Sequence, residues 1–255
     1  MSGPWVAIIL ILVSSLPLIA VYVWFRAAKY QFSLHRFLFA LLAGAAAFFP
    51  ALIFQDMLSF SFQSIRAALF FRFFIRIALT EEISRLILLI IFFSLNSLVV
   101  SRAAKKSRGS GQTSIHQPLS INTIKKATAT GLVAGLGFAL LENAVYAASD
   151  INILPLRIIF TAAVHAACGS RIGAAAVLLR SNPFQALLRV FTAVAIHGIY
   201  NMMIVMPGFT PLAAILIAIS ALITAILAIR GGWSDVKISA EETPPADAQL
   251  PNTPS

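Results

Sequence analysis

Long apolar stretches separated by short polar segments run along most of the chain. Each stretch holds about 20 residues, the length that an α-helix needs to cross the hydrocarbon core of a bilayer. The pattern predicts an all-α fold: a polytopic membrane helix bundle with about seven transmembrane helices. The predicted spans are residues 5–25, 37–55, 77–100, 127–148, 156–179, 186–206 and 209–229.

Residues 60–76, FSFQSIRAALFFRFFIR, depart from this pattern. The segment is apolar but contains Arg66, Arg72 and Arg76. Such a composition is typical of an interfacial or re-entrant helix that lies against the membrane surface. A full crossing would instead invert every later element, and the sequence leaves both alternatives open.

Composition supports a membrane protein. The chain is 59% hydrophobic and 11% charged, with a mean hydropathy of +0.89. A soluble globular domain is about half apolar and about one quarter charged. The single cysteine, Cys168, excludes an intrachain disulfide and is interpreted as a small packing residue.

The distribution of basic residues bears on orientation. The net charge is +10, and most Lys and Arg residues fall in alternate loops, as the positive-inside rule requires. This predicts a retained first helix, an external N-terminus and a cytoplasmic C-terminus. Nucleic-acid binding is excluded because the basic residues do not gather on one face with interleaved aromatic residues.

The chain is expected to form one transmembrane helical domain over residues 1–230. Residues 231–255 are Pro-rich and acidic, and we expect a disordered cytoplasmic tail. The loop between the third and fourth spans is basic and contains His116, which is interpreted as a solvated residue.

Ionisable residues inside the predicted spans mark a candidate site. A charged side chain near the bilayer centre costs roughly 2.5–3.5 kcal/mol, so such residues are usually functional. Three of the nine acidic residues, Glu81, Glu82 and Glu142, lie inside spans, as do His165 and His197. At a rise of about 1.5 Å per residue, all five lie about 6 to 14 Å below the outer ends of their helices. This shared depth predicts a single site in the outer half of the bilayer.

Helical spacing adds two more residues to this layer. Arg85 lies three residues after Glu82 and four after Glu81, so it can pair with either carboxylate. Asn201 lies four residues after His197 on the same helix face.

Small residues in GLVAGLGFALLENAVY predict close helix packing beside the site. Gly131, Gly135 and Gly137 allow another backbone to approach, a common device in membrane helices. Phe138 and Glu142, four residues apart, share one face of this helix.

This set of residue types suits peptide hydrolysis. The reaction needs a base to activate water, donors for the oxyanion and an acid for the leaving amine. A glutamate can serve as the base, and imidazole and amide groups can donate to the oxyanion. Glutamate and histidine are also zinc ligands, so the cofactor is either absent or a divalent metal such as zinc.

A second class of protein uses the same residue types. Carboxylates and histidines at one depth also suit a proton- or cation-coupled transporter. The lack of an internal repeat and the restriction of the polar layer to the outer half argue against it. A catalytically inactive membrane scaffold is the other alternative.

Four motifs in chain order resemble those of the PrsW family of intramembrane proteases, which is related to the CAAX-protease and bacteriocin-processing superfamily. EEISR (residues 81–85) matches the Glu-Glu-x-x-Lys/Arg motif, and FALLE (138–142) matches Phe-x-x-x-Glu. His165 stands where a lone histidine is expected, and HGIYN (197–201) resembles His-x-x-x-Asn/Asp. Arg85 replaces a lysine and Asn201 a possible aspartate, and both keep the charge or shape required.

The resemblance implies a multi-helix protease core over about residues 77–206. It implies an endopeptidase of the bacterial plasma membrane that cleaves membrane-anchored substrates near the outer face. The expected partners are a single-pass membrane protein, such as an anti-sigma factor, and the lipid bilayer. The site residues that it implies are Glu81, Glu82, Arg85, Glu142, His165, His197 and Asn201.

Overall fold

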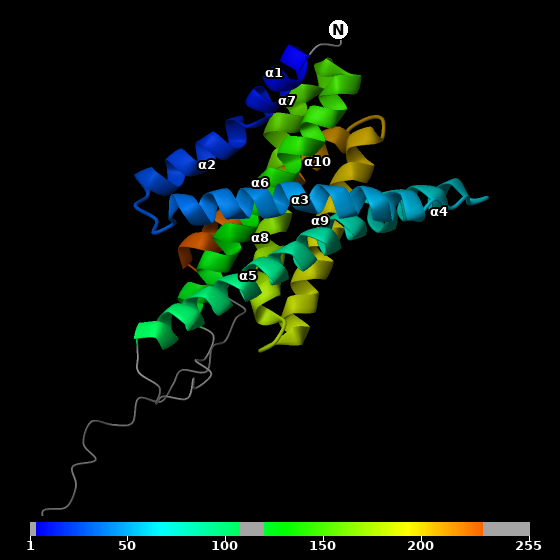
Figure 1. The fold of residues 1–255 in the computed structure, drawn as a ribbon. Helices are drawn as coiled ribbons and strands as arrows, with labels where there is room; N and C mark the ends of the chain where they lie inside the picture. The colour runs from blue at the N-terminus through cyan, green and yellow to red at the C-terminus, as the bar shows by residue number, and fades with distance from the viewer. Residues whose placement is uncertain (1–3, 108–119, 232–255) are drawn as a thin grey trace, which may run out of the picture.

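The computed structural model describes residues 4–107 and 120–231, and these residues form a bundle of helices without strands (Figure 1). Three short segments depart from α-helical geometry: η2 is a 3₁₀-helix, and η1 and η3 are π-helices. The elements are α1 (Pro4–Ser14), α2 (Leu16–Ala27), α3 (Leu34–Met57), α4 (Ile65–Phe70), η1 (Phe71–Leu79), α5 (Thr80–Ser107), α6 (Ile121–Ser149), η2 (Ile151–Ile153), α7 (Leu154–Leu156), η3 (Arg157–Thr161), α8 (Ala162–Leu178), α9 (Pro183–Val205) and α10 (Thr210–Gly231).

The predicted all-α membrane bundle is confirmed. Among the described residues, six helices are long and apolar enough to cross a membrane by length and composition. The remaining predicted span, residues 77–100, corresponds to α5, a helix of 28 residues that is not among these six. The six candidate spans are Ile8–Ala27, Leu34–Met57, Ile121–Ser149, Ile151–Leu178, Pro183–Val205 and Thr210–Gly231.

The first predicted helix is interrupted at Ser15, between α1 and α2. Pro17 lies in the first turn of α2, where it lacks an amide hydrogen and its ring crowds the carbonyl of the preceding turn. The Ser15 hydroxyl donates to the carbonyl of Leu12 at 2.7 Å and satisfies one of the carbonyls at this break. The span is therefore two helical segments.

The arginine-containing segment 60–76 is helical from Ile65 onward and continuous with the helix that follows it, and its placement at the membrane surface stays a prediction. Helix α4 begins at Ile65 and runs without a break through η1 into α5. The Ser64 hydroxyl accepts from the amide of Ala67 and caps the start of α4. Four of the six residues 69–74 are phenylalanine, and their apolar contacts leave no polar turn at which the helix could end.

Helix α8 lies at the centre of the bundle and packs against α5, α6, α9 and α10. Nearly every side chain from Ala162 to Ala175 is buried. Helices α3 and α5 run obliquely across this group on one side, with α3 crossing α6 (Figure 1). The candidate site lies where these two layers of helices meet.

Glycine residues set the closest helix contacts, as the small-residue pattern predicts. On α6, Gly131 faces Gly169 and Gly173 of α8, and Gly135 faces the carbonyl of His165. A Cβ atom at either position would overlap those backbone atoms. The opposite side of α6 is equally close to α3, because Gly137 faces the backbone of Leu41.

Some predicted features lie outside the described residues. They are the disordered tail, apart from Gly231, and the part of the basic loop that contains His116.

We expect Gly131→Ala to reduce the free energy of unfolding by roughly 1–3 kcal/mol, the usual cost of overpacking. The added methyl group meets backbone atoms of α8, which cannot rotate away. Thermal unfolding in detergent measures the change. Gly231→Ala is the matched control because no atom lies within 4 Å of its added Cβ. Equal melting temperatures for the two variants would contradict this account of the α6–α8 contact.

Candidate active site

Glu81 and Glu82 lie in the first turn of α5, and both are buried. Adjacent residues on a helix point in different directions, so the two carboxylates have different neighbours. Glu82 Oε1 accepts from Arg85 Nη2 at 2.6 Å and lies 2.8 Å from His197 Nδ1. Glu81 Oε1 accepts from Gln55 Nε2 at 3.0 Å, whereas Glu81 Oε2 has no hydrogen-bond partner. Each glutamate therefore has one oxygen engaged and one without a hydrogen-bond partner, and the two differ in their partners: Arg85 and His197 for Glu82, Gln55 for Glu81.

Arg85 pairs with both glutamates, as its spacing predicts, but unequally. Its Nη2 atom lies 2.6 Å from Glu82 and 3.7 Å from Glu81. The guanidinium is fully buried and lies 4.8 Å above the ring of Phe138 on α6. Because an unpaired charge in such surroundings would be strongly unfavourable, Arg85 and Glu82 stabilise each other's ionised form.

Glu142 on α6 holds His165 on α8. Glu142 Oε2 lies 2.7 Å from His165 Nε2 and 2.8 Å from Arg157 Nη2. Arg157 begins η3, and its Nε atom also donates to Asn143 Oδ1 at 3.0 Å. One carboxylate oxygen therefore faces both an imidazole and a guanidinium.

In their neutral form, the two histidines present lone pairs toward Glu81. An ionised carboxylate only accepts hydrogen bonds, so the nitrogen that faces it in a neutral imidazole carries the hydrogen. These nitrogens are His197 Nδ1, against Glu82, and His165 Nε2, against Glu142. The remaining nitrogens are acceptors: His197 Nε2 lies 3.7 Å from Glu81 Oε2, and His165 Nδ1 has no hydrogen-bond partner.

The donor set of Glu81, His165 and His197 fits a divalent metal ion. One ligand atom from each lies within 4.8 Å of the others, and all three residues are buried. Three buried lone-pair donors that face one another repel unless a cation or a proton lies between them. Two histidines and one carboxylate with an open fourth position are also typical of catalytic zinc sites, and a carboxylate commonly orients each ligating histidine.

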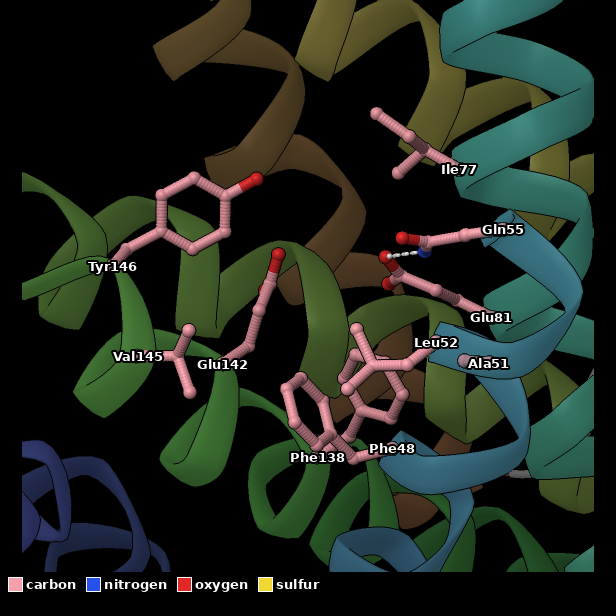
Figure 2. A pocket seen from close by; sticks show the side chains of 10 residues that line it. All are labelled: Phe48, Ala51, Leu52, Gln55, Ile77, Glu81, Phe138, Glu142, Val145 and Tyr146. Carbon is pink, nitrogen blue, oxygen red and sulfur yellow. Dashed lines mark hydrogen bonds between the residues drawn. The ribbon is translucent and has the colours of Figure 1, made fainter. Parts of the chain in front are cut away.

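A cavity of about 220 Å³ lies beside this cluster, between α3, η1, α5 and α6. Figure 2 shows Glu81 and Glu142 reaching into it from opposite walls, with the Gln55 amide against Glu81. The rest of the wall is largely apolar. The lining residues are Phe48, Ala51, Leu52, Gln55, Ile77, Glu81, Phe138, Glu142, Val145 and Tyr146.

A family model described as PrsW family intramembrane metalloprotease matches residues 33–229. The chain belongs to the PrsW family. No curated protein and no solved structure matches it. Membership in the PrsW family makes the chain a membrane-embedded peptidase and an integral, multi-pass membrane protein, which agrees with its apolar helices.

The structure brings together six of the seven residues predicted from the PrsW-like motifs: Glu81, Glu82, Arg85, Glu142, His165 and His197. Asn201 is half-buried and lies four residues along α9 from His197, about 6 Å away along the axis. In the part of the chain that the structure describes, no hydrogen bond links its side chain to the cluster. The role of Asn201 in the site stays a prediction.

Two neighbours of the site were not predicted as part of it. Arg157 lies at the start of the predicted span 156–179, and an arginine inside a span is a signal in itself. Gln55, at the end of the span 37–55, carries an amide that could have been noticed for the same reason. Neither position reveals its partner without tertiary structure.

Two further side chains, one of them the thiol interpreted as a small packing residue, lie outside the candidate site. Cys168 is fully buried, and its thiol contacts the carbonyl of Ala193 at 3.4 Å. Arg171 binds a neighbouring helix, since its Nη2 donates to Thr224 Oγ1 of α10 at 2.7 Å.

We expect Arg85→Gln to destabilise the fold by about 3–5 kcal/mol, because it removes one partner of a buried ion pair and leaves Glu82 uncompensated. Chemical or thermal unfolding in detergent measures this loss. Arg72→Gln is the control, since Arg72 is an exposed arginine of η1. A melting temperature of Arg85→Gln equal to that of the control would contradict the proposed pairing.

Proposed function

We propose that the chain is an endopeptidase that cleaves membrane-anchored proteins near the outer face of the membrane, with Glu81 as the group that activates water. One observation carries this proposal. Glu81 Oε2 is buried and unpartnered at the wall of the cavity, next to the free nitrogens of His165 and His197. Glu82 Oε2 is also buried without a hydrogen-bond partner, but Glu82 does not line the cavity and its Oε1 is shared by Arg85 and His197, so Glu81 is the better candidate.

In this proposal, Glu81 Oε2 takes a proton from water while the water oxygen bonds to the scissile carbonyl carbon. The proton then passes to the nitrogen of the leaving amine as the C–N bond breaks, and Glu81 is regenerated. Gln55 keeps the other oxygen of Glu81 occupied, which directs Oε2 toward the histidines. The Asn201 amide is proposed as a further donor to the oxyanion.

The remaining groups hold the histidines in place. Arg85 and Glu82 orient His197, and Glu142 orients His165. Glu81, His165 and His197 would hold a divalent metal such as zinc, as a metalloprotease family implies. Such a metal, when bound, lowers the pKa of water and polarises the scissile carbonyl. Glu81 would then be a metal ligand rather than a base acting alone.

The size of the cavity bears on the form of the substrate. A helix with its side chains is about 10–12 Å wide, which is too wide for a cavity of about 220 Å³. The substrate is therefore proposed to enter as a short extended segment of a single-pass membrane protein. The family resemblance suggests an anti-sigma-factor-like protein of a bacterial cell membrane. The proposed outer-face location rests on the distribution of basic loops, which favours an external N-terminus and a cytoplasmic C-terminus.

We expect Glu81→Gln to lower the rate of cleavage by about 10²–10⁴-fold, the usual contribution of an acid–base group, without loss of fold. Purified protein reconstituted in liposomes with single-pass candidate substrates gives the rate by gel electrophoresis. Asp56→Asn, which neutralises an exposed carboxylate at the end of α3, is the control and should cleave normally. A folded Glu81→Gln protein that cleaves at the wild-type rate would eliminate the proposal.

Removing metal ions distinguishes a metal-dependent site from one in which Glu81 acts as a base without metal. Because three lone-pair donors converge without a partner of their own, we expect a chelator to abolish cleavage and added zinc to restore it. His165→Ala should bind zinc more weakly than wild type in a competition assay. Full activity after complete chelation would show instead that Glu81 works as a base without metal.

A further inference from the structure

Two similar chains of side chains, each Arg–Glu–His, converge on Glu81. In the first, Glu82 Oε1 lies 2.6 Å from Arg85 Nη2 and 2.8 Å from His197 Nδ1. In the second, Glu142 Oε2 lies 2.8 Å from Arg157 Nη2 and 2.7 Å from His165 Nε2. In both chains a single carboxylate oxygen faces the guanidinium and the imidazole. No family motif quoted above contains Arg157, the arginine of the second chain.

The two arginines differ in their surroundings. The Arg85 side chain is completely buried, whereas that of Arg157 is 16% exposed, at the edge of the site. Arg157 is nevertheless fixed on three sides by α6. Its guanidinium lies 3.9 Å above the ring of Tyr146, its Nε donates to Asn143, and its Nη2 pairs with Glu142. Such a tightly held side chain is suited to orienting its neighbours.

We infer that Arg157 is a positioning residue of the active site, which acts through Glu142 to direct the free nitrogen of His165 toward Glu81. This inference rests on the proposed function. With Arg157 in place, Glu142 is held as an ionised acceptor, so His165 Nε2 donates to it and His165 Nδ1 keeps its lone pair. Without Arg157, nothing else among the described residues fixes that Glu142 oxygen on the side away from His165.

The direction in which zinc affinity changes when Arg157 is removed distinguishes a positioning role from a purely electrostatic one. Arg157 is positively charged, so its removal would by itself strengthen the binding of a cation nearby. Loss of a residue that orients a metal-ligating histidine instead weakens binding, typically 10–100-fold.

The test uses full-length Arg157→Gln in detergent and in liposomes, with Arg72→Gln as the control. Arg72 also lies over an aromatic ring, that of Phe73, but on the exposed side of η1. Zinc alone is the probe, and its affinity is measured by competition with a chelator. We expect Arg157→Gln to bind zinc about 10–100-fold more weakly and to lower kcat by a similar factor at unchanged KM. Arg157→Lys, which keeps the charge beside Glu142, should recover part of both losses.

Three results would overturn the inference: zinc affinity that is unchanged, zinc affinity that is increased, or a rise in KM alone. The last would mean that Arg157 contacts the substrate. If Arg157→Gln does not fold, Arg157→Gln combined with Glu142→Gln removes the unpaired buried charge, and wild-type zinc affinity in that protein would also refute the inference. Should the wild type bind zinc but cleave no substrate, the proposed function fails while the zinc affinities still decide the role of Arg157.

Discussion

The contact between α6 and α8 is the constraint on which the rest of the structure depends. Gly131 and Gly135 bring the two backbones so close that a single added Cβ atom would overlap α8. Gly135 faces the carbonyl of His165 itself, and Glu142 follows Gly135 by two turns on α6. The short distance between the helices is what allows a glutamate side chain to reach the imidazole of the neighbouring helix. In a membrane, where apolar helices gain little by leaving lipid, such close packing is a main source of helix association.

Compensation of charge is the second requirement. Glu82, Arg85, His165 and His197 are essentially inaccessible to solvent, and each is tolerated because an oppositely charged or hydrogen-bonding group lies against it. Two atoms of the candidate metal-binding group are exceptions to this compensation. Glu81 Oε2 and His165 Nδ1 are buried without hydrogen-bond partners, and both belong to the group that could hold a metal. Other described polar atoms, such as Glu82 Oε2, are also buried without partners, but these two converge, which supports the proposal of a ligand or a reaction at that point.

The sequence by itself determined the fold class and most of the residues of the candidate site. Periodic apolar stretches of bilayer length are unambiguous, because lipid leaves a backbone few alternatives to a helix. The rarity of charges in those stretches singled out Glu81, Glu82, Glu142, His165 and His197, since each is costly there without a function. Local spacing was enough for Arg85, whose partners lie on its own helix. Spacing along the sequence did not predict that a helix starts at Ile65, where phenylalanine contacts decide the local geometry. It also did not predict the break at Ser15, where one proline decides it.

Only the tertiary structure decided which partners each of those residues contacts. Adjacent glutamates are equivalent in the sequence, and they differ here because Arg85 and His197 bind Glu82 closely, whereas Glu81 accepts from Gln55 and lies 3.7 Å from both Arg85 and His197. The recruitment of Arg157 and Gln55 depends on contacts between helices far apart in the chain, which no spacing rule reveals. The direction of each histidine lone pair is likewise set by the carboxylate on another helix. The physical reason is common to all three: depth along a helix can be counted from sequence, whereas rotation toward a partner is fixed only when the helices pack.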